Sequence, residues 1–363
     1  MKLRSNTACV LAVASMSLIA TACGQQTGAV SPLEDPVNIH VLNAQRAAGT
    51  DYSGLLARLC ITPPGGGDAM SGVRRAGGAN GLSEAVLNAG PLEPQKVPPR
   101  ADWYQEPRKI FDNFYWIGIK RNSAWLIKTS EGLIVIDSLY HYAAEPSMVE
   151  GIRKLGFDPK DVKYIIISHA HGDHVEGAKT LQDLGAKVVM GAADWELLLK
   201  GPEIYGGKPK RDMEVTGDQK LTLGDTTINI YLTPGHTDGT LSYIFNVQDQ
   251  GKPRVIAYSG GTAFNFPRSV ERMEQYIATQ RRLAQLAADA GATVVLSNHS
   301  EFDLAYMKAR MLSSMGPGEE NPFVVKDGPK RYFEVTNECA EAVKERLIQG
   351  TDIPSLDRVP AKK

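Results

Sequence analysis

The chain has 363 residues, of which 42% are hydrophobic and 22% are charged, so it can bury a packed core and is not disordered as a whole. Its 40 Lys and Arg residues against 41 Asp and Glu residues give a net charge of −1, which disfavours a purely electrostatic nucleic-acid binder, and we expect no nucleic-acid partner. No two of the four cysteines (Cys9, Cys23, Cys60 and Cys339) form a C-x-x-C pair, so any metal site has to be built from His and carboxylates.

The N-terminus is typical of an export signal. A short basic segment, residues 1–4, runs into an almost uncharged stretch over residues 8–22, which is too short for a transmembrane helix. Small residues precede Cys23 and fit two outcomes: release at an A-x-A site, or a bacterial lipobox in which Cys23 is acylated. We therefore predict a signal peptide over residues 1–22 and an exported chain that is either periplasmic or anchored to a membrane as a lipoprotein.

Residues 23–99 form an N-terminal extension. The apolar spacing over residues 37–61 predicts one or two amphipathic helices interrupted at Gly49-Thr50-Asp51. Residues 62–99 contain 8 Gly and 6 Pro, which predicts a linker. Two interpretations of the extension stay open: a tether that spaces a domain from a membrane, or a segment that covers an active-site mouth or a subunit contact.

Residues 100–363 have the length of one large α/β domain. Apolar runs predict strands over residues 114–119, 124–129 and 133–137, a helix over 145–155, a strand over 162–168, a helix over 175–184 and a strand over 187–190. After a polar, Gly-rich segment over residues 200–218 come predicted strands at 226–232, 241–247 and 255–259, a helix at 270–290, a strand at 293–297 and a helix at 338–349. Strands first, then alternating helices and strands in both halves, indicate two sheets with helices outside.

Three of the seven histidines fall within six residues, in His169-Ala-His171-Gly-Asp173-His174. The motif directly follows a buried strand and precedes a helix, where loops of α/β sheets carry function. On such a loop His169 and His171 can point one way while Asp173 and His174 point another. Because imidazole and carboxylate are ligands of catalytic zinc, the motif predicts two adjacent metal sites that share one loop.

Two further histidines also follow apolar strands. His236 lies in a Thr-Pro-Gly-His-Thr turn and His299 lies in a Ser-Asn-His-Ser segment. Alone, a histidine at a strand end is more often a satisfied, partly buried side chain; beside the first motif, we interpret both as metal ligands. His141 also follows a strand and is a candidate for lining the pocket, whereas His40 is interpreted as a solvated helix residue.

These motifs, in this order and at this spread, resemble the metallo-β-lactamase superfamily. The similarity covers residues 109–349 and, with no cysteine ligand and with its segments 114–118, 132–137 and 321–324, is most like subclass B3 metallo-β-lactamases. The resemblance implies an α/β fold, the αββα sandwich (metallo-β-lactamase fold), over residues 100–363. It implies two Zn²⁺ ions, with His169, His171 and His236 on the first and Asp173, His174 and His299 on the second.

The chain departs from the family pattern in the segment Ala257-Tyr-Ser-Gly-Gly-Thr-Ala263. The Asp that bridges the metals in many superfamily hydrolases corresponds to Gly261, which disfavours the glyoxalase-like, lactonase-like and ribonuclease-like branches. The serines that lactamases of subclass B3 commonly place here to hold substrate are missing as well. Thr262 and Asn265 are the candidates to replace them.

The resemblance implies a dinuclear zinc-dependent hydrolase acting on a small-molecule substrate. Because a zinc-bound water has a pKa of about 7, a metal-bound hydroxide is the expected nucleophile on a carbonyl carbon, and Asp173 would ligate and orient it. Hydrolysis of a β-lactam amide is the first interpretation; another ester, lactone or thioester is the alternative, and a non-catalytic metal-binding lipoprotein is a third. Iron or manganese stays open as the metal, because His and carboxylate ligands tolerate both.

Asp137 and the two cysteines at positions 60 and 339 are each open to two interpretations. Asp137 ends a predicted strand near the motif, and is either a carboxylate that fixes an imidazole tautomer or a turn residue. Cys60 and Cys339 are either a disulfide that ties the N-terminal helices to the last helix or two buried thiols.

Overall fold

The computed structural model describes residues 34–61, 94–316 and 318–352. The predicted signal peptide, Cys23 and residues 62–93 of the predicted linker lie outside the described residues, so export, lipidation and the domain boundaries stay predictions. None of the helices in the described ranges is both long enough and apolar enough to cross a membrane.

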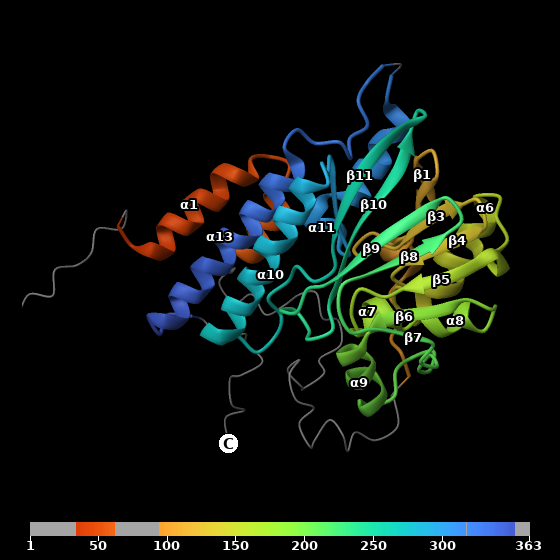
Figure 1. Ribbon diagram of the computed structural model, residues 1–363, viewed down its shortest axis with the longest axis horizontal. Coiled ribbons are helices and arrows are strands. Elements are labelled where there is room, and N and C mark those ends of the chain that lie inside the picture. The colour runs from red at the N-terminus through yellow and green to blue at the C-terminus, as the bar shows by residue number, and fades with distance from the viewer. Residues whose placement is uncertain (1–33, 62–93, 317, 353–363) are drawn as a thin grey trace, which may run out of the picture.

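The strands in the described part of the chain form two sheets (Figure 1). The seven-stranded sheet keeps the chain order, with antiparallel pairing from β1 to β4 and parallel pairing from β4 to β7. Its strands are β1 (Arg108–Phe111), β2 (Phe114–Trp116), β3 (Trp125–Thr129), β4 (Gly132–Ile136), β5 (Val162–Ile166), β6 (Lys187–Gly191) and β7 (Met213–Val215). The five-stranded sheet has the order β12-β11-β10-β9-β8, and only its β11–β12 pair is parallel. Its strands are β8 (Gln219–Leu223), β9 (Thr226–Leu232), β10 (Leu241–Asp249), β11 (Lys252–Ser259) and β12 (Val294–Ser297).

The two sheets pack face to face, with helices on both outer faces. Ile134 and Ile166 of the seven-stranded sheet share a buried apolar cluster with Phe245 and Val294 of the five-stranded sheet. Because successive strand residues point to opposite faces, the neighbouring residues of the same strands pack outward against helices. This four-layer arrangement confirms the predicted αββα sandwich.

The helices divide between the two outer faces and the connections. The seven-stranded sheet is covered by α5 (His141–Ala143), the π-helical segment η1 (Ala144–Val149), α6 (Glu150–Lys154), α8 (Ala178–Gln182) and α9 (Ala192–Lys200). The five-stranded sheet is covered by α10 (Val270–Asp289) and α13 (Gly328–Ile348). Shorter helices lie in the connections: α4 (Arg100–Trp103), η2 (Pro159–Asp161), α7 (Gly172–Val175), α11 (Ser300–Asp303), α12 (Ala305–Met311) and η3 (Leu312–Ser314).

Some elements differ from the predictions. Strands β1, β7 and β8 and helix α9 were not predicted, and β7 lies inside the polar, Gly-rich segment over residues 200–218, for which no strand was predicted. These strands are short and lie at or next to sheet edges, where an apolar run is not needed. The predicted helix over 175–184 is instead the end of α7 and the separate helix α8. Gly177 lies between them, and a Cβ there would come 2.0 Å from the carbonyl oxygen of Ser138.

Helix α13 begins ten residues before the predicted start at residue 338. Its first turn contains Pro329, which suits this position because a helix leaves its first N–H groups unbonded. Tyr332 and Phe333 are buried and extend the apolar face toward the start of the helix.

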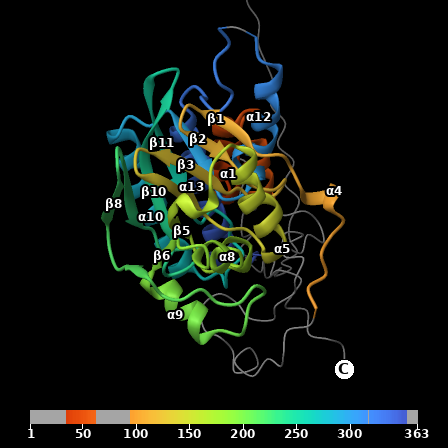
Figure 2. The same ribbon diagram turned by 90° about the vertical axis from the view of Figure 1, so that its right-hand side faces the viewer.

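The two predicted N-terminal helices are present as α1 (Pro36–Ala48) and α2 (Ser53–Leu59). Helix α1 lies alongside α13 (Figures 1 and 2), and a disulfide joins Cys60, just after α2, to Cys339 of α13. Arg331 of α13 forms a 2.7 Å ion pair with Asp51 and donates to two carbonyl groups at the end of α1. The two N-terminal helices are therefore fixed to the last helix, and the two cysteines form a disulfide rather than two buried thiols.

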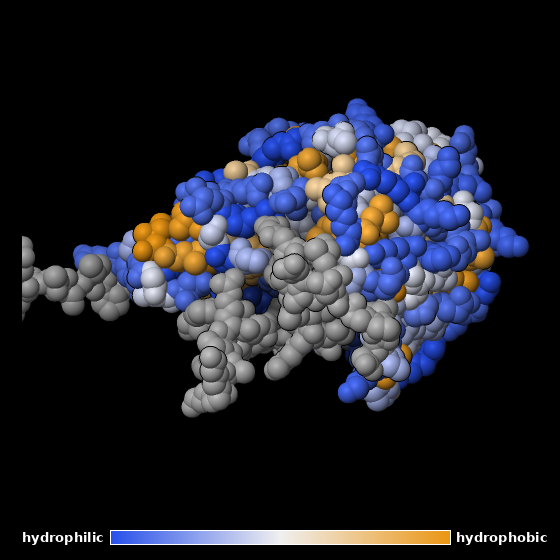
Figure 3. All heavy atoms as spheres, turned by 90° about the horizontal axis from the view of Figure 1, so that it is seen from below, coloured by the Kyte–Doolittle hydropathy of each residue, from blue (hydrophilic) through white to orange (hydrophobic). Residues whose placement is uncertain are grey.

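Seen from below, the surface is mainly hydrophilic, and its apolar side chains form small patches, one of them at the end where α1 and α13 lie (Figure 3). Large apolar side chains that remain exposed include Ile39 and Leu42 of α1 and Ile348 of α13. Exposed apolar residues of this kind are ordinary on a globular surface.

Candidate metal centre

The three segments that carry the predicted ligands meet at one edge of the sandwich. The loop with His169 follows β5, the turn with His236 follows β9, and His299 follows β12. The backbone N–H of Leu241 donates to the carbonyl oxygen of Ser168 at 2.8 Å, which holds the first loop against the start of β10. The two sheets thus bring side chains from three distant parts of the chain to one place.

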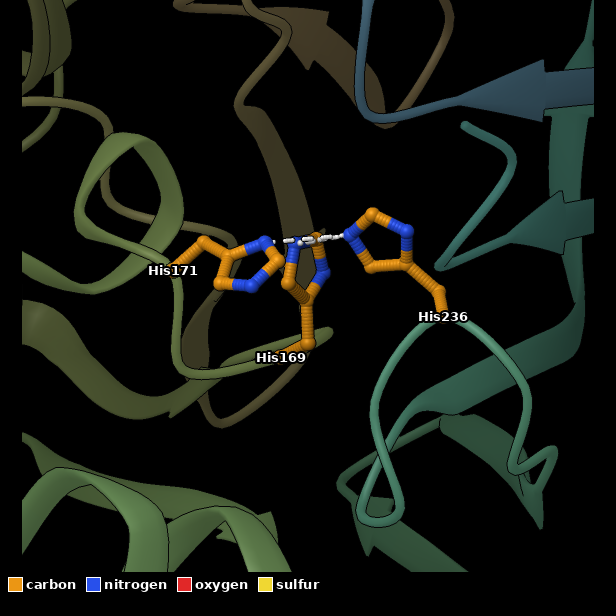
Figure 4. Close-up of side chains that lie close together, drawn as sticks. All are labelled: His169, His171 and His236. Carbon is orange, nitrogen blue, oxygen red and sulfur yellow. Dashed lines mark hydrogen bonds between the residues drawn. The ribbon is translucent and has the colours of Figure 1, made fainter. Parts of the chain in front are cut away.

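Three of the predicted ligands form what we call the three-histidine group: His169, His171 and His236. Nε2 of His236 lies 3.1 Å from Nε2 of His169 and 3.1 Å from Nδ1 of His171, so three ring nitrogens converge (Figure 4). All three rings are at most partly exposed. Burial lowers the pKa of His169 and of His236 well below the ordinary value, and neighbouring histidines lower both further, so these two rings are neutral.

The other three predicted ligands form the mixed group: Asp173, His174 and His299. Oδ2 of Asp173 lies 3.2 Å from Nε2 of His174 and 3.5 Å from Nε2 of His299, and the two Nε2 atoms are 3.2 Å apart. Burial alone would raise the pKa of Asp173, but His174 and His299 beside it hold that pKa below its ordinary range. The two groups are adjacent, because the ring centroids of His169 and His174 are 4.4 Å apart.

The hydrogen bonds around the three-histidine group test whether it suits a cation. Nδ1 of His169 lies 2.9 Å from the carbonyl oxygen of Gly260, and Nδ1 of His236 lies 2.8 Å from that of Ala263. A carbonyl oxygen only accepts, so both Nδ1 atoms carry the proton and both Nε2 atoms carry a lone pair. The two Nε2 atoms are 3.1 Å apart, and their lone pairs repel each other unless a positive charge lies between them. The donor set therefore fits a metal ion such as zinc.

Asp137 fixes the orientation of a ring in the mixed group. Its Oδ2 accepts from Nδ1–H of His174 at 3.1 Å and from the hydroxyl of Tyr258 at 2.8 Å, and its carboxylate also accepts from the backbone N–H and hydroxyl of Ser168. Asp137 has a φ of 59°, in the left-handed region that Asp tolerates better than most residues. Both open interpretations of Asp137 therefore hold: it is a turn residue, and it sets the tautomer of His174.

Two residues of the site were not predicted. Asp194, near the start of α9, accepts from the backbone N–H groups of Ala170 at 2.7 Å and Gly239 at 2.9 Å and from the hydroxyl of Thr237 at 2.9 Å. It therefore links the loop of His169 and His171 to the turn of His236. An acidic residue just after the end of a parallel strand was the signal that could have identified it.

Asn122 is the second residue that was not predicted. It lies in the connection between β2 and β3, is 3% exposed and pairs with His299 across an isolated β-bridge. Its Nδ2 lies 2.9 Å from Oδ2 of Asp173 and 3.2 Å from Nδ1 of His299. No sequence pattern identifies this asparagine, because its role depends on the segment after β12 lying beside the connection between β2 and β3.

The predicted substrate contacts meet different outcomes. The prediction for Thr262 is wrong, because its hydroxyl is buried and lies 2.8 Å from the hydroxyl of Tyr332 and 3.2 Å from that of Ser297. Asn265 is exposed on the loop after β11 and stays a prediction. His141 is exposed and lines a cavity of about 400 Å³. None of the six predicted metal ligands lines this cavity, so the structure does not bring His141 into the metal centre.

Gly261, which the family resemblance placed at the position of a metal-bridging Asp, has no room for a side chain. A Cβ on this residue would come 2.6 Å from Cβ of His236 and 2.8 Å from Cγ2 of Thr240. A side chain at position 261 would therefore displace His236.

Comparison with known proteins assigns the chain to a family. The family model of the metallo-beta-lactamase superfamily matches residues 117–250. The chain belongs to the metallo-β-lactamase superfamily, a superfamily of metallo-hydrolases, and its structural neighbours are of subclass B3.

Two solved structures and one protein sequence illustrate the similarity. Native FEZ-1 metallo-β-lactamase from Legionella gormanii is 28% identical with a TM-score of 0.57, over 63% of this chain and 92% of that chain. BJP-1, a subclass B3 metallo-β-lactamase of Bradyrhizobium japonicum, is 28% identical with a TM-score of 0.57, over 68% of this chain and 95% of that chain. Hydroxyacylglutathione hydrolase of Acidiphilium cryptum is 28% identical over 125 residues, which are 34% of this chain and 44% of that protein.

Proposed function

We propose that the chain is an exported, dinuclear zinc-dependent hydrolase and that its substrate is the amide bond of a β-lactam. The observation that carries this proposal is the pair of facing lone pairs on His169 and His236, completed by His171 and set beside the mixed group. Membership of the superfamily and the fold shared with BJP-1 and FEZ-1 support it.

The three-histidine group would hold one zinc ion and the mixed group the other. Zinc supplies a Lewis acid and lowers the pKa of a coordinated water to about 7. The chain's own residues keep the ligand atoms in place: Asp137 holds the Nδ1–H of His174, and two backbone carbonyl groups hold the rings of His169 and His236. The side chain of Asp173 is 19% exposed, so its carboxylate can accept a hydrogen bond from a water that approaches a carbonyl carbon.

A specific observation favours a second candidate substrate class, another ester, lactone or thioester. At the end of β11 and in the loop after it, the hydroxyls of Ser259 and Thr262 are buried and Gly261 has no side chain, so this segment offers a substrate no hydroxyl group. The relative from Acidiphilium cryptum is named for the hydrolysis of an acyl derivative of glutathione. The same metal chemistry would serve either substrate class.

The proposed export rests on the N-terminal sequence and is supported by the disulfide between Cys60 and Cys339, because disulfides persist in oxidising compartments. Expression of the full chain in a bacterium, followed by mass spectrometry, tests it. An N-terminus at Cys23, with or without lipid, supports export to the periplasm or to a membrane, and an uncleaved N-terminus recovered with the cytosol overturns it.

Metal analysis followed by a substrate panel tests the activity. We expect zinc-loaded protein to cleave a chromogenic cephalosporin at least about a hundredfold faster than a His171→Ala variant, because a lost ligand removes a metal. Cleavage of esters, lactones or thioesters without cleavage of the cephalosporin would favour the second candidate. Bound zinc with no hydrolysis of any substrate would overturn both and leave a non-catalytic metal-binding protein.

A further inference from the structure

The candidate ligand rings differ in what faces their second nitrogen. Nδ1–H of His169 and of His236 meets a carbonyl oxygen, and that of His174 meets the carboxylate of Asp137. Each of these three rings is therefore held in an orientation that directs its Nε2 atom into the centre. Nδ1 of His299 instead lies 3.2 Å from the Nδ2 atom of Asn122, which is a donor.

The same amide nitrogen makes both contacts of Asn122. One of its N–H groups donates to Oδ2 of Asp173 at 2.9 Å, and the other points at Nδ1 of His299 at 3.2 Å. With Nδ1 accepting, the proton of a neutral His299 ring is on Nε2, the atom that faces the mixed group. This tautomer cannot bind a metal ion through Nε2.

Turning the amide of Asn122 over does not remove the conflict. The oxygen would then accept from Nδ1–H of His299 but would also stand 2.9 Å from the carboxylate oxygen of Asp173, where two acceptors repel. Because Asn122 is 3% exposed and His299 is 8% exposed, water has little access to satisfy the atom left without a partner. In either orientation, a metal in the mixed group leaves one of the two contacts of Asn122 unfavourable.

We propose that Asn122 is a positioning residue that keeps the metal affinity of the mixed group below that of the three-histidine group. The two groups then fill in order, the three-histidine group first. This inference rests on the proposed metal chemistry of the centre. A residue that merely braced Asp173 and His299 would have the opposite effect, since its removal would weaken metal binding in the mixed group.

The direction of the change in affinity is therefore the test. Metal-free protein is titrated with Zn²⁺ in a calorimeter and with Co²⁺ in an absorption spectrometer, and a His236→Ala variant identifies the step that belongs to the three-histidine group. For the unsubstituted chain we expect two steps, with the second weaker. Asn122→Ala should tighten the second step about tenfold and leave the first unchanged, because it removes one mismatched buried hydrogen bond.

Two further variants complete the experiment. Asn122→Asp should also tighten the second step, because its carboxylate accepts from Nδ1–H of His299 and its repulsion with the nearby carboxylate of Asp173 is relieved when a cation binds. Asn246→Ala, at an exposed position on β10, is the matched control and should change neither step. The inference is overturned if the second step is unchanged or weaker in both Asn122 variants. It is also overturned if the second step of the unsubstituted chain is already as tight as the first. Both outcomes leave the proposed function intact. Failure of the unsubstituted chain to bind either metal overturns the proposed function itself and this inference with it.

Discussion

The Nε2 atoms of His169 and His236 lie 3.1 Å apart, and both carry lone pairs because each ring is protonated on Nδ1 and donates that N–H to a backbone carbonyl group. A bound cation removes this repulsion, so the metal should stabilise the fold. We predict that a chelator lowers the free energy of unfolding by about 3 kcal/mol or more, the value expected for a ligand present at a hundredfold excess over its Kd. Denaturant titrations with and without the chelator measure it.

Two variants check this stabilisation. His236→Ala should reduce the loss caused by the chelator, because it removes the repulsion and one ligand together. His40→Ala should leave the loss unchanged, since His40 lies on α1, 2.8 Å from Glu338 and away from the centre. Equal losses in the unsubstituted chain and in the His236→Ala variant would contradict the role given to this pair.

The second prediction concerns Asp194, whose carboxylate joins the loop of His169 to the turn of His236. Asp194→Asn keeps the shape but replaces one acceptor oxygen by a donor, which faces Gly239 or the pair Ala170 and Thr237. We expect a loss of about 2–4 kcal/mol in the free energy of unfolding, together with weaker metal binding in the three-histidine group. Calorimetric metal titration reports the second effect, and the exposed Asp161→Asn serves as control. Unchanged metal affinity would show that the link is not required.

The third prediction concerns Gly261. Gly261→Ala should cost about 1–3 kcal/mol of stability, because the new methyl group would overlap with Cβ of His236 and force the turn to move. We also expect Gly261→Asp to bind metal less well than the unsubstituted chain, although it restores the residue that bridges two metals in many superfamily members. Metal titration of both variants decides this, and tighter binding by Gly261→Asp would show that the turn can yield.

The ligands of the centre were predictable because their signal is local. Four of the six are in one short motif after a buried strand, and His236 and His299 each directly follow an apolar strand, so their meeting follows from the order of the sheets. Asn122 carries no such signal, because its role depends on neighbours supplied by other elements, and Asp194 carries only the weak signal of an acidic residue shortly after a parallel strand.

The wrong prediction for Thr262 has a related cause. Its hydroxyl is in the expected segment but turns away from the centre toward Tyr332 of α13, a helix that begins earlier than its apolar spacing suggested. The direction of a short side chain depends on which element covers the loop, and the sequence of the loop does not contain that information. The αββα layers were predictable because buried strands and amphipathic helices recur along the chain.

The fourth prediction concerns the disulfide between Cys60 and Cys339, which are 279 residues apart in the sequence. Closing so long a loop restricts the unfolded chain, and loss of the bond should lower the free energy of unfolding by about 2–5 kcal/mol. Denaturant unfolding of the Cys339→Ser variant measures the loss, and a reducing agent should lower the stability of the unsubstituted chain by a similar amount. If the Cys339→Ser variant is destabilised but the reducing agent does not change the stability of the unsubstituted chain, the loss in the variant comes from packing rather than from the covalent bond.

The last prediction is a pH dependence that arises from Asp303 at the end of α11. Burial raises the pKa of this carboxyl to about 6, although Lys308 and the backbone N–H groups of Ser297 and Ala305 oppose the rise. The folded chain therefore holds the proton more tightly than the unfolded chain, so this group stabilises the fold fully below about pH 4, and the stabilisation is lost as the pH rises through 6. The expected loss is up to about 3 kcal/mol, from a rise of about two pKa units. Asp303→Asn does not titrate, so the stability of the unsubstituted chain relative to this variant should fall between pH 4 and pH 7. A difference that stays constant across this range, measured by denaturant unfolding in one buffer series, would mean that Asp303 does not take up its proton there.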